Sequence, residues 1–231
     1  MIEAPLVDYI DHSCPYLDVV LDRLVLPQPR HRKGERPLNP REFFNAAMAG
    51  RFHLNPLAVT AQAVVETGWF SKLIAPHNYA GIKWRADFAQ FGAKPQEAVS
   101  GEFKGGRFVR QPSVFASFPS LDAFLRAYDW KMTHQKNYAV ARDNADCVWG
   151  FLAGLFRGGW ATDPDYFAKL ARVAAHLSGG LLGSEVMAAA RLRSALSLAT
   201  SRNVLLPWMP EVIESAMATA FRRAKKGGGA S

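Results

Sequence analysis

The chain has 231 residues, of which 49% are hydrophobic, and a formal net charge of +8. This hydrophobic content excludes a wholly disordered chain, and the length suits one ordinary domain with appendages or two small domains. The charge predicts an anionic partner, for which nucleic acid, anionic lipid and bacterial wall polymers all qualify. Cys14 and Cys147 are the only cysteines, and two reduced thiols are favoured over a disulfide. The scattered histidines indicate no metal site, and we expect no cofactor.

The N-terminal sequence does not resemble a secretory signal. MIEAPLVDYIDHSCPYL carries acidic residues and lacks the basic and then apolar order of such signals. No apolar stretch approaches the roughly 20 residues that a membrane span requires. The nearest, residues 148–155, is too short and is soon followed by Arg157. We therefore expect a protein that is made in the cytoplasm without a cleavable signal and has no membrane span.

The first half of the chain predicts an arm, two helices and a β-lobe. Residues 1–38 end in the proline-rich and basic PQPRHRKGERPLNP, which favours neither helix nor strand. Helices are expected from Asn39-Pro40 to about Gly50 and from Asn55-Pro56 to about Gly68, because Asn caps helices well and Pro suits their first position. Between residues 79 and 118, glycines separate short aromatic and β-branched runs, and GEFKGGRFV predicts a hairpin.

The second half of the chain is predicted to be helical. Helical periodicity covers residues 121–133, 147–156, a segment after Asp163-Pro164 with Asp163 as N-cap, and the amphipathic segments 184–199 and 210–225. This order of elements predicts an α+β fold. The expected divisions are an arm at 1–38, a domain at 39–178, and a helical extension with a basic flexible tail at 179–231.

Glu66 is the first candidate for chemistry. It is the only ionisable residue between Leu54 and Ser71, on a helix that is apolar nearly all round and therefore predicted to be buried. Burial raises the pKa of a lone carboxyl, and a raised pKa is what a general acid requires near neutral pH. The alternatives are a glutamate that reaches solvent at the helix end beside Gly68, or one that pairs with a distant arginine.

The segment around Glu66 resembles a known family motif. AQAVVETGWFSKLIAPHNYAGIKW is similar to the motif of glycoside hydrolase family 73, bacterial N-acetylglucosaminidases that include autolysins and flagellar rod-associated wall hydrolases. The matching residues are Ala61, Gln62, Glu66, Thr67, Gly68, Trp69, Ser71, Asn78, Tyr79, Gly81, Ile82 and Lys83. Phe70 departs from the usual glycine, which leaves the local loop shape open but does not affect the assignment of the acid.

Two further segments extend the resemblance over residues 40–177. SGEFKGGRFVRQPSVFASFPSLDAFLRAY and GGWATDPDYFAKL resemble the family's later motifs, in the family's order. The resemblance implies a lysozyme-like helical domain with a small β-lobe beside the cleft. It implies that Glu66 is the catalytic acid and that Glu102, on the predicted hairpin, is the second carboxylate. Glu102 is alternatively a surface residue flanking a turn, and Glu97 is then the fallback.

The same resemblance suggests which residues bind sugar. Trp69, Tyr79 and Trp160 are candidates for lining the cleft, because flat rings stack on the apolar faces of sugars; each is alternatively a core residue. Trp160 stands where the family has tyrosine, which keeps stacking and loses a phenolic hydrogen bond. Asn78 either orients substrate or caps a turn.

The implied activity is hydrolysis of the N-acetylglucosaminyl-β-1,4-N-acetylmuramic acid bond in peptidoglycan glycan strands. The mechanism is either inverting, with two separated carboxyls, or assisted by the sugar's own N-acetyl group. Alternatives are a lytic transglycosylase and a non-catalytic wall-binding component of a phage tail or secretion apparatus. Nucleic-acid binding has only the charge in its favour and is not expected.

The implied site of action is the periplasm or the cell wall. Without a cleavable signal, the protein is expected to arrive there by phage lysis, tail delivery or specialised secretion. Its expected partners are a component of a tail or secretion apparatus, or an immunity protein that plugs the cleft around Glu66.

Overall fold

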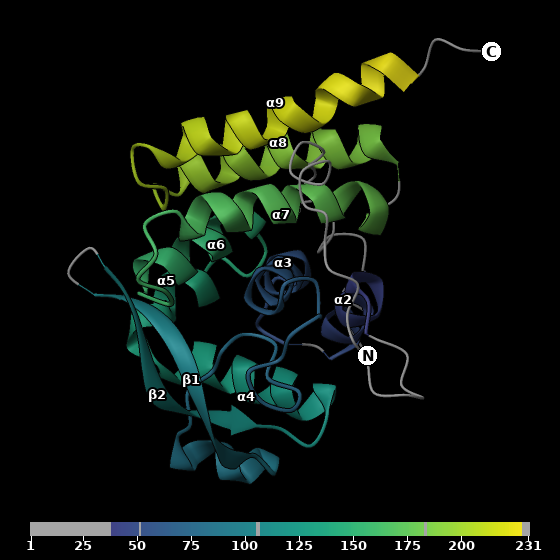
Figure 1. The fold of residues 1–231 in the computed structure, drawn as a ribbon. Helices are drawn as coiled ribbons and strands as arrows, with labels where there is room; N and C mark the ends of the chain where they lie inside the picture. The colour runs from purple at the N-terminus through teal and green to yellow at the C-terminus, as the bar shows by residue number, and fades with distance from the viewer. Residues whose placement is uncertain (1–37, 51, 105–106, 183, 228–231) are drawn as a thin grey trace.

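The computed structural model describes residues 38–50, 52–104, 107–182 and 184–227 (Figure 1). Within these ranges the chain forms eight α-helices, two 3-10 helices and one two-stranded sheet. Their bounds are α2 (Pro40–Ala49), α3 (Pro56–Thr67), η1 (Ala86–Phe91), β1 (Lys94–Lys104), β2 (Arg107–Ser117), α4 (Leu121–His134), η2 (Lys136–Tyr138), α5 (Ala139–Arg142), α6 (Val148–Arg157), α7 (Tyr166–Leu181), α8 (Glu185–Ser201) and α9 (Met209–Gly227). This mainly helical fold with a small β-lobe confirms the predicted α+β class. The predicted arm lies outside the described residues, apart from Leu38.

Both predicted Asn-Pro helix starts are present. The Asn39 side chain accepts a hydrogen bond from the Glu42 N–H (3.0 Å), and the Glu42 carboxylate accepts one from the Asn39 N–H (3.1 Å). This reciprocal capping satisfies N–H groups that a helix start leaves without partners. Asn55 caps α3 through the N–H of Ala58 (3.0 Å). Gly68 ends α3 in the left-handed conformation, with a φ of 54°.

Helix α3 lies inside the fold, as its apolar sequence predicts. Its first nine residues are all buried, including the polar Thr60 and Gln62. It packs against α2, α6 and, most extensively, α7. Figure 1 shows α3 surrounded by these helices, with α7 passing over it. This packing fixes the last turn of α3, which carries Glu66, relative to α7.

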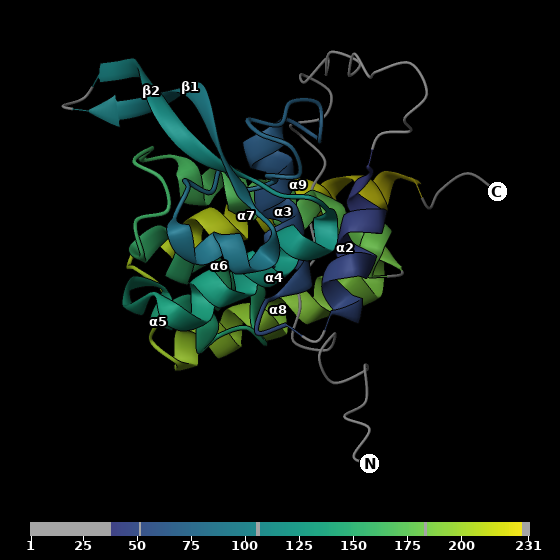
Figure 2. The same ribbon diagram turned by 90° about the horizontal axis from the view of Figure 1, so that it is seen from below.

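The β-lobe is one long antiparallel hairpin. Strands β1 and β2 have 11 residues each and pair along their whole length, so the hairpin is longer than the predicted GEFKGGRFV. Its base is joined to the segment after α3, because the Trp84 N–H donates to the Val114 carbonyl (2.9 Å) and the Ala116 N–H donates to the Ile82 carbonyl (2.9 Å). Figure 2 shows the hairpin projecting beyond the helices.

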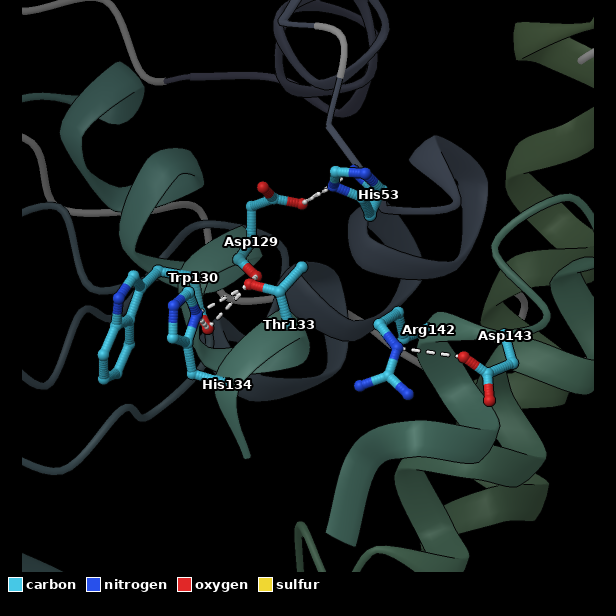
Figure 3. Close-up of polar contacts among 7 residues, drawn as sticks. All are labelled: His53, Asp129, Trp130, Thr133, His134, Arg142 and Asp143. Atoms are coloured by element: carbon cyan, nitrogen blue, oxygen red, sulfur yellow. Dashed lines mark hydrogen bonds and ion pairs between the residues drawn. The ribbon is translucent and has the colours of Figure 1, made fainter. Parts of the chain in front are cut away.

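The polar side of α4 holds the connection between α2 and α3. Asp129 accepts a hydrogen bond from the His53 N–H (2.6 Å), and the His53 Nδ1 lies 3.5 Å from the same oxygen (Figure 3). One turn later, the His134 ring stacks on Trp130 with the ring centroids 4.5 Å apart. Helix α4 therefore anchors the loop from which α3 begins.

The helix predicted to begin at Pro164 begins two residues later, at Tyr166. Asp163 does not cap it. The Asp163 Oδ1 accepts a hydrogen bond from the Asp165 N–H (2.9 Å), which forms a local turn before the helix. Burial raises the pKa of Asp163, but hydrogen bonds from Lys169 and the Asp165 N–H outweigh it, so the pKa is lowered.

Helices α8 and α9 form a further layer over α7 (Figure 1). Leu192, Met209 and Ile213 on these helices are fully buried and belong to the same apolar core as α3 and α7. The predicted boundary between residues 178 and 179 falls inside α7, which continues to Leu181. None of the described helices combines the length and apolarity needed to cross a bilayer.

Polar contacts connect α8 and its C-terminal end to the segment before α6. Cys147 is a buried free thiol that donates to the Ala195 carbonyl (3.3 Å). The Arg202 guanidinium meets both carboxylate oxygens of Asp146 (2.6 Å each). Cys14 lies outside the described residues. The C-terminal helices are thus joined to the predicted domain by side-chain contacts as well as by apolar packing.

Candidate active site

A left-handed turn follows the last turn of α3. The φ angles of Gly68, Trp69 and Phe70 are 54°, 61° and 61°. A residue with a Cβ costs roughly 1–2 kcal/mol in this region, which glycine adopts freely. Thr67 stabilises the turn, because its hydroxyl donates to the Ala63 carbonyl (2.6 Å) and accepts from the Phe70 N–H (2.8 Å). Phe70 thus keeps a glycine-like backbone at the position where the motif has glycine.

The two carboxylate oxygens of Glu66 have different surroundings. The Tyr166 hydroxyl donates a hydrogen bond to Oε1 (2.6 Å). Oε2 lies next to Gly81, where an added Cβ atom would come within 3.3 Å of it. The Trp160 indole also acts on the carboxylate and lowers its pKa. In the described part of the chain, no Lys, Arg or His forms an ion pair with Glu66.

Glu66 is crowded by protein and still accessible to solvent. Burial raises the pKa of its carboxyl to about 7, against a smaller lowering by hydrogen bonds from Tyr166 and Trp160. The side chain nevertheless keeps a large exposed surface. Crowding and exposure are compatible for a carboxyl that is enclosed by protein on most sides and open on one. The raised pKa agrees with the sequence-based expectation, although the residue is not sealed in the core.

A chain of buried hydrogen bonds continues from Glu66 into the core. Gln62 donates through Nε2 to the Tyr166 oxygen (2.9 Å) and accepts through Oε1 from the Tyr128 hydroxyl of α4. Burial raises the pKa of both tyrosines well above its ordinary value, so both hydroxyls keep their protons. The sequence alone gives no role to Gln62, Tyr128 or Tyr166. Gln62 stands four residues before Glu66 on α3, a spacing that signals side-by-side side chains.

Trp160 lies next to the acid and is held by protein groups. Its ring stacks on Tyr128, with centroids 5.2 Å apart and an interplanar angle of 24°. The Lys131 ammonium lies over the same ring, 5.0 Å from its centroid. Its indole N–H also donates to the Ala80 carbonyl (3.2 Å). These contacts fix the ring beside Glu66, and its stacking on a sugar stays a prediction.

Tyr79, another predicted sugar-binding residue, packs in the core. It is 5% exposed, and its ring meets those of Phe43 and Phe70 with centroids 5.4 and 5.9 Å apart. The Phe70 ring also packs against Phe43, at 5.6 Å. The ring of Tyr79 is therefore covered by protein. Of the two positions that the sequence allowed for this residue, cleft lining or core, the structure has the core position. Its hydroxyl lies 3.1 Å from the His77 Nδ1.

Asn78 is tied to the backbone, whereas Trp69 keeps solvent contact. The buried Asn78 amide donates to the carbonyls of Ile82 and Ala116 (2.8 Å each) and accepts from the Ile82 N–H (2.9 Å). These bonds use both amide hydrogens, so Asn78 acts as the turn-forming residue that the sequence offered as one alternative. Trp69 is half-buried, with its ring edge against His176 (centroids 5.2 Å apart).

The predicted second carboxylate lies on the hairpin. Glu102 stands on β1 opposite Val109, and its side chain lies outside what the structure describes. Its role therefore stays a prediction. The fallback residue, Glu97, lies nearer the base, opposite Val114, and is exposed. Among the described residues, no three His, Cys, Asp or Glu side chains are grouped to hold a metal ion.

The sequence of this domain matches a family model named Glucosaminidase, described as mannosyl-glycoprotein endo-beta-N-acetylglucosaminidase, over residues 44–178. The chain belongs to the glucosaminidase family. The matched region contains Glu66, its partner Tyr166 and both hairpin strands, which places the whole candidate site in the family domain. Helices α8 and α9 lie beyond it. This match confirms the resemblance to a family of glycoside hydrolases that the sequence motifs indicated.

Curated relatives and a solved structure agree with this membership. A peptidoglycan hydrolase FlgJ from Pseudomonas aeruginosa is 29% identical over 162 residues, which cover 64% of this chain and 40% of that one. The peptidoglycan hydrolase FlgJ of Vibrio cholerae is 31% identical over 122 residues, covering 51% and 36%. The chain thus matches less than half the length of either relative. A crystal structure of a peptidoglycan hydrolase mutant from Sphingomonas sp. A1 has a TM-score of 0.51 and 24% identity, covering 68% of this chain and 95% of that one, and shows the shared fold.

Proposed function

We propose that the chain is a peptidoglycan hydrolase that cleaves the N-acetylglucosaminyl-β-1,4-N-acetylmuramic acid bond, with Glu66 as general acid. The observation that carries the proposal is the Glu66 carboxyl, whose pKa burial raises to about 7 and which stays open to solvent on one side. A general acid must hold its proton when the substrate arrives, and it must be reachable. The two relatives named peptidoglycan hydrolase support wall glycan as the substrate.

In the proposed reaction, Glu66 gives its proton to the glycosidic oxygen. The bond from that oxygen to C1 breaks, and the sugar ring gains oxocarbenium character. In the inverting route, water attacks C1 from the opposite face and passes a proton to Glu102. In the substrate-assisted route, the sugar's own N-acetyl oxygen attacks C1 instead, and water then opens the resulting oxazolinium ion at C1 and gives a proton back to Glu66. Glu66 has the same task in both routes, so its assignment does not depend on that of Glu102.

Digestion of purified wall sacculi tests the activity. After borohydride reduction, mass spectrometry is expected to find reduced N-acetylglucosamine at the new ends. Glu66→Gln keeps the shape of the side chain and cannot donate a carboxyl proton, so we expect at least a 100-fold slower release. Glu185→Gln, an exposed change at the start of α8, is the control and is expected to leave the rate unchanged.

Other outcomes identify other functions. Full activity in Glu66→Gln refutes the assignment of the acid. Products with 1,6-anhydro ends indicate a lytic transglycosylase, and binding to sacculi without release indicates a wall-binding component. Glu102→Gln separates the two routes, since its activity is lost in the inverting route and kept in the substrate-assisted one.

The proposal places the action of the protein at the cell wall, reached by phage lysis, tail delivery or specialised secretion. An immunity protein, as a proposed partner, would cover Glu66, because blocking the proton donor inactivates the enzyme. Protection of the last turn of α3 from hydrogen exchange in such a complex is the expected result. Protection confined to α8 and α9 contradicts it.

A further inference from the structure

The hydrogen bonds that lead to Glu66 run in one direction. The Tyr166 oxygen accepts a hydrogen bond from the Gln62 Nε2 (2.9 Å), so its single hydrogen is available for the Glu66 Oε1 (2.6 Å). The Gln62 Oε1 accepts the hydrogen of Tyr128. In this amide orientation, the hydrogen of the Tyr128 hydroxyl has the Gln62 Oε1 as its acceptor. Each hydrogen bond in the chain from Tyr128 to Glu66 therefore points toward the carboxylate.

This direction makes the two oxygens of Glu66 unequal. A proton on Oε1 would meet the hydrogen of Tyr166, and one of the two hydrogens would lose its acceptor. A proton on Oε2 leaves the whole chain of bonds intact. Oε2 lies beside Gly81, which has no side chain and leaves open the space that a Cβ atom would occupy 3.3 Å from this oxygen.

We propose that Gln62 and Tyr128 are positioning residues, which act through Tyr166 to keep Oε1 an acceptor and to hold the transferable proton of Glu66 on Oε2. The inference rests on the proposed role of Glu66 as general acid and adds the atom that donates. Neither Gln62 nor Tyr128 hydrogen-bonds the carboxylate, and both are buried. The hydrogen bonds of the Tyr128 hydroxyl and the Gln62 amide therefore reach Glu66 through the Tyr166 hydroxyl, whereas the Tyr128 ring, which Phe retains, stacks on Trp160.

The proposal predicts a remote effect of the Tyr128 hydroxyl. In Tyr128→Phe, either orientation of the Gln62 amide leaves one of its polar atoms unpaired, so the observed orientation loses its advantage. When the amide turns over, its Oε1 attracts the Tyr166 hydrogen away from Glu66. The carboxylate then loses a donor that stabilises its charged form, and the pKa of Glu66 rises.

Other polar groups near Glu66 stay in place in this experiment. The Trp160 indole keeps its place, because its N–H donates to the Ala80 carbonyl. The Lys131 ammonium lies beyond it, over the rings of Trp160 and Tyr138 at 5.0 and 4.8 Å. Burial, together with the nearby Arg85 charge, lowers the pKa of Lys131 to about 8. Lys131 is therefore largely charged while Glu66 titrates near pH 7.

The test is a carbon-13 NMR titration of the Glu66 carboxyl in the full chain without substrate. Tyr166→Phe removes the donor and is expected to raise the pKa of Glu66 by about 1. Tyr128→Phe is expected to raise the pKa of Glu66 as well, by a smaller amount. The double variant should match Tyr166→Phe alone, because Tyr128 acts only through Tyr166. The alkaline limb of wall digestion should move up in pH with each pKa.

Thr60→Val is the matched control. Thr60 is a buried residue of α3 whose hydroxyl donates to the Pro56 carbonyl (2.6 Å), apart from the chain of bonds to Glu66. Its loss is expected to leave the pKa of Glu66 unchanged. An unchanged pKa in Tyr128→Phe, or additive shifts in the double variant, overturns the proposal.

A second measurement needs no substitution and covers the case in which Tyr128→Phe does not fold. In the unmodified protein, the side-chain nitrogen-15 resonance of Gln62 should titrate with the same midpoint as the Glu66 carboxyl. A Gln62 resonance that ignores this titration also overturns the proposal. Because both titrations are made without substrate, a failure here is distinct from a failure of the proposed activity, which the Glu66→Gln digest reports.

Discussion

Phe70 allows the cost of a left-handed backbone to be measured against a matched site in the same protein. Phe70 has a φ of 61°, while Phe44 lies in the regular helix α2, and both residues are 7% exposed. Replacing either ring by Ala or Gly removes about 3–5 kcal/mol of packing. The comparison of Ala with Gly at each site cancels most of this loss and leaves the backbone preference.

The two sites should respond with opposite sign. At position 70, the left-handed conformation costs a residue with a Cβ atom roughly 1–2 kcal/mol, and Gly avoids this cost. Gly loses more chain entropy on folding than Ala does, which offsets about 0.5–1 kcal/mol of the gain. Phe70→Gly is therefore expected to be more stable than Phe70→Ala by about 0.5–1 kcal/mol. At position 44, Ala is expected to be more stable than Gly by about 1 kcal/mol, the usual helix difference.

Urea unfolding followed by circular dichroism measures these differences. The free energy of unfolding of each of the four variants is obtained by linear extrapolation, and the slopes must agree before the values are compared. The reasoning is refuted if Phe70→Ala is as stable as Phe70→Gly while Phe44 shows the ordinary helix order. Phe70 would then carry no backbone strain, and its aromatic packing alone would explain its presence.

Three other substitutions test the site and the extension. The folded-state pKa of Glu66, about 7, lies above its ordinary value of 4.5. The charged carboxyl therefore destabilises the fold above pH 7, and this penalty disappears below pH 4.5. The gain in melting temperature on Glu66→Gln should be larger at pH 8 than at pH 4.5. Asn78→Ala removes three buried hydrogen bonds and should lower the free energy of unfolding by about 2–4 kcal/mol; a loss below that in urea unfolding contradicts its role in the turn. Ile213→Ala empties a fully buried position on α9 and should cost about 2–4 kcal/mol; a negligible cost would mean that α9 contributes little to the core.

Features set by residues close in sequence were predictable. Asn39 and Asn55 each bond an N–H three residues ahead, so the starts of α2 and α3 depend on a few neighbouring residues. The same local logic misplaced the start of α7. Asp163 has the residue type of an N-cap and is followed by proline, yet its carboxylate bonds the N–H two residues ahead and the ammonium of Lys169. An Asp followed by Pro is typical both of a helix N-cap and of a turn, so the residue types alone did not distinguish the two.

Features that depend on distant helices were not predictable. The bonds from Tyr128 to Gln62 and from Gln62 to Tyr166 join residues 66 and 104 positions apart, and no periodicity reveals which buried tyrosine meets which amide. Tyr79 shows the same limit for packing. It lies in an irregular segment without a repeating face, so its sequence left open whether the ring lines a cleft or joins Phe43 in the core.

The early end of α3 reconciles two demands on Glu66 that oppose each other. A carboxyl in the middle of this buried helix would be out of reach of a substrate, and one on a solvated surface would be ionised at neutral pH. Because Gly68 ends the helix two residues later, Glu66 stands on the last turn, with Oε1 against Tyr166 in the core and an exposed side beyond the helix end. Trp69 and Phe70 continue the chain beyond the helix end in the left-handed conformation. Burial on the core side raises the pKa of Glu66, and strained backbone of the kind found in the turn is tolerated where a site depends on it.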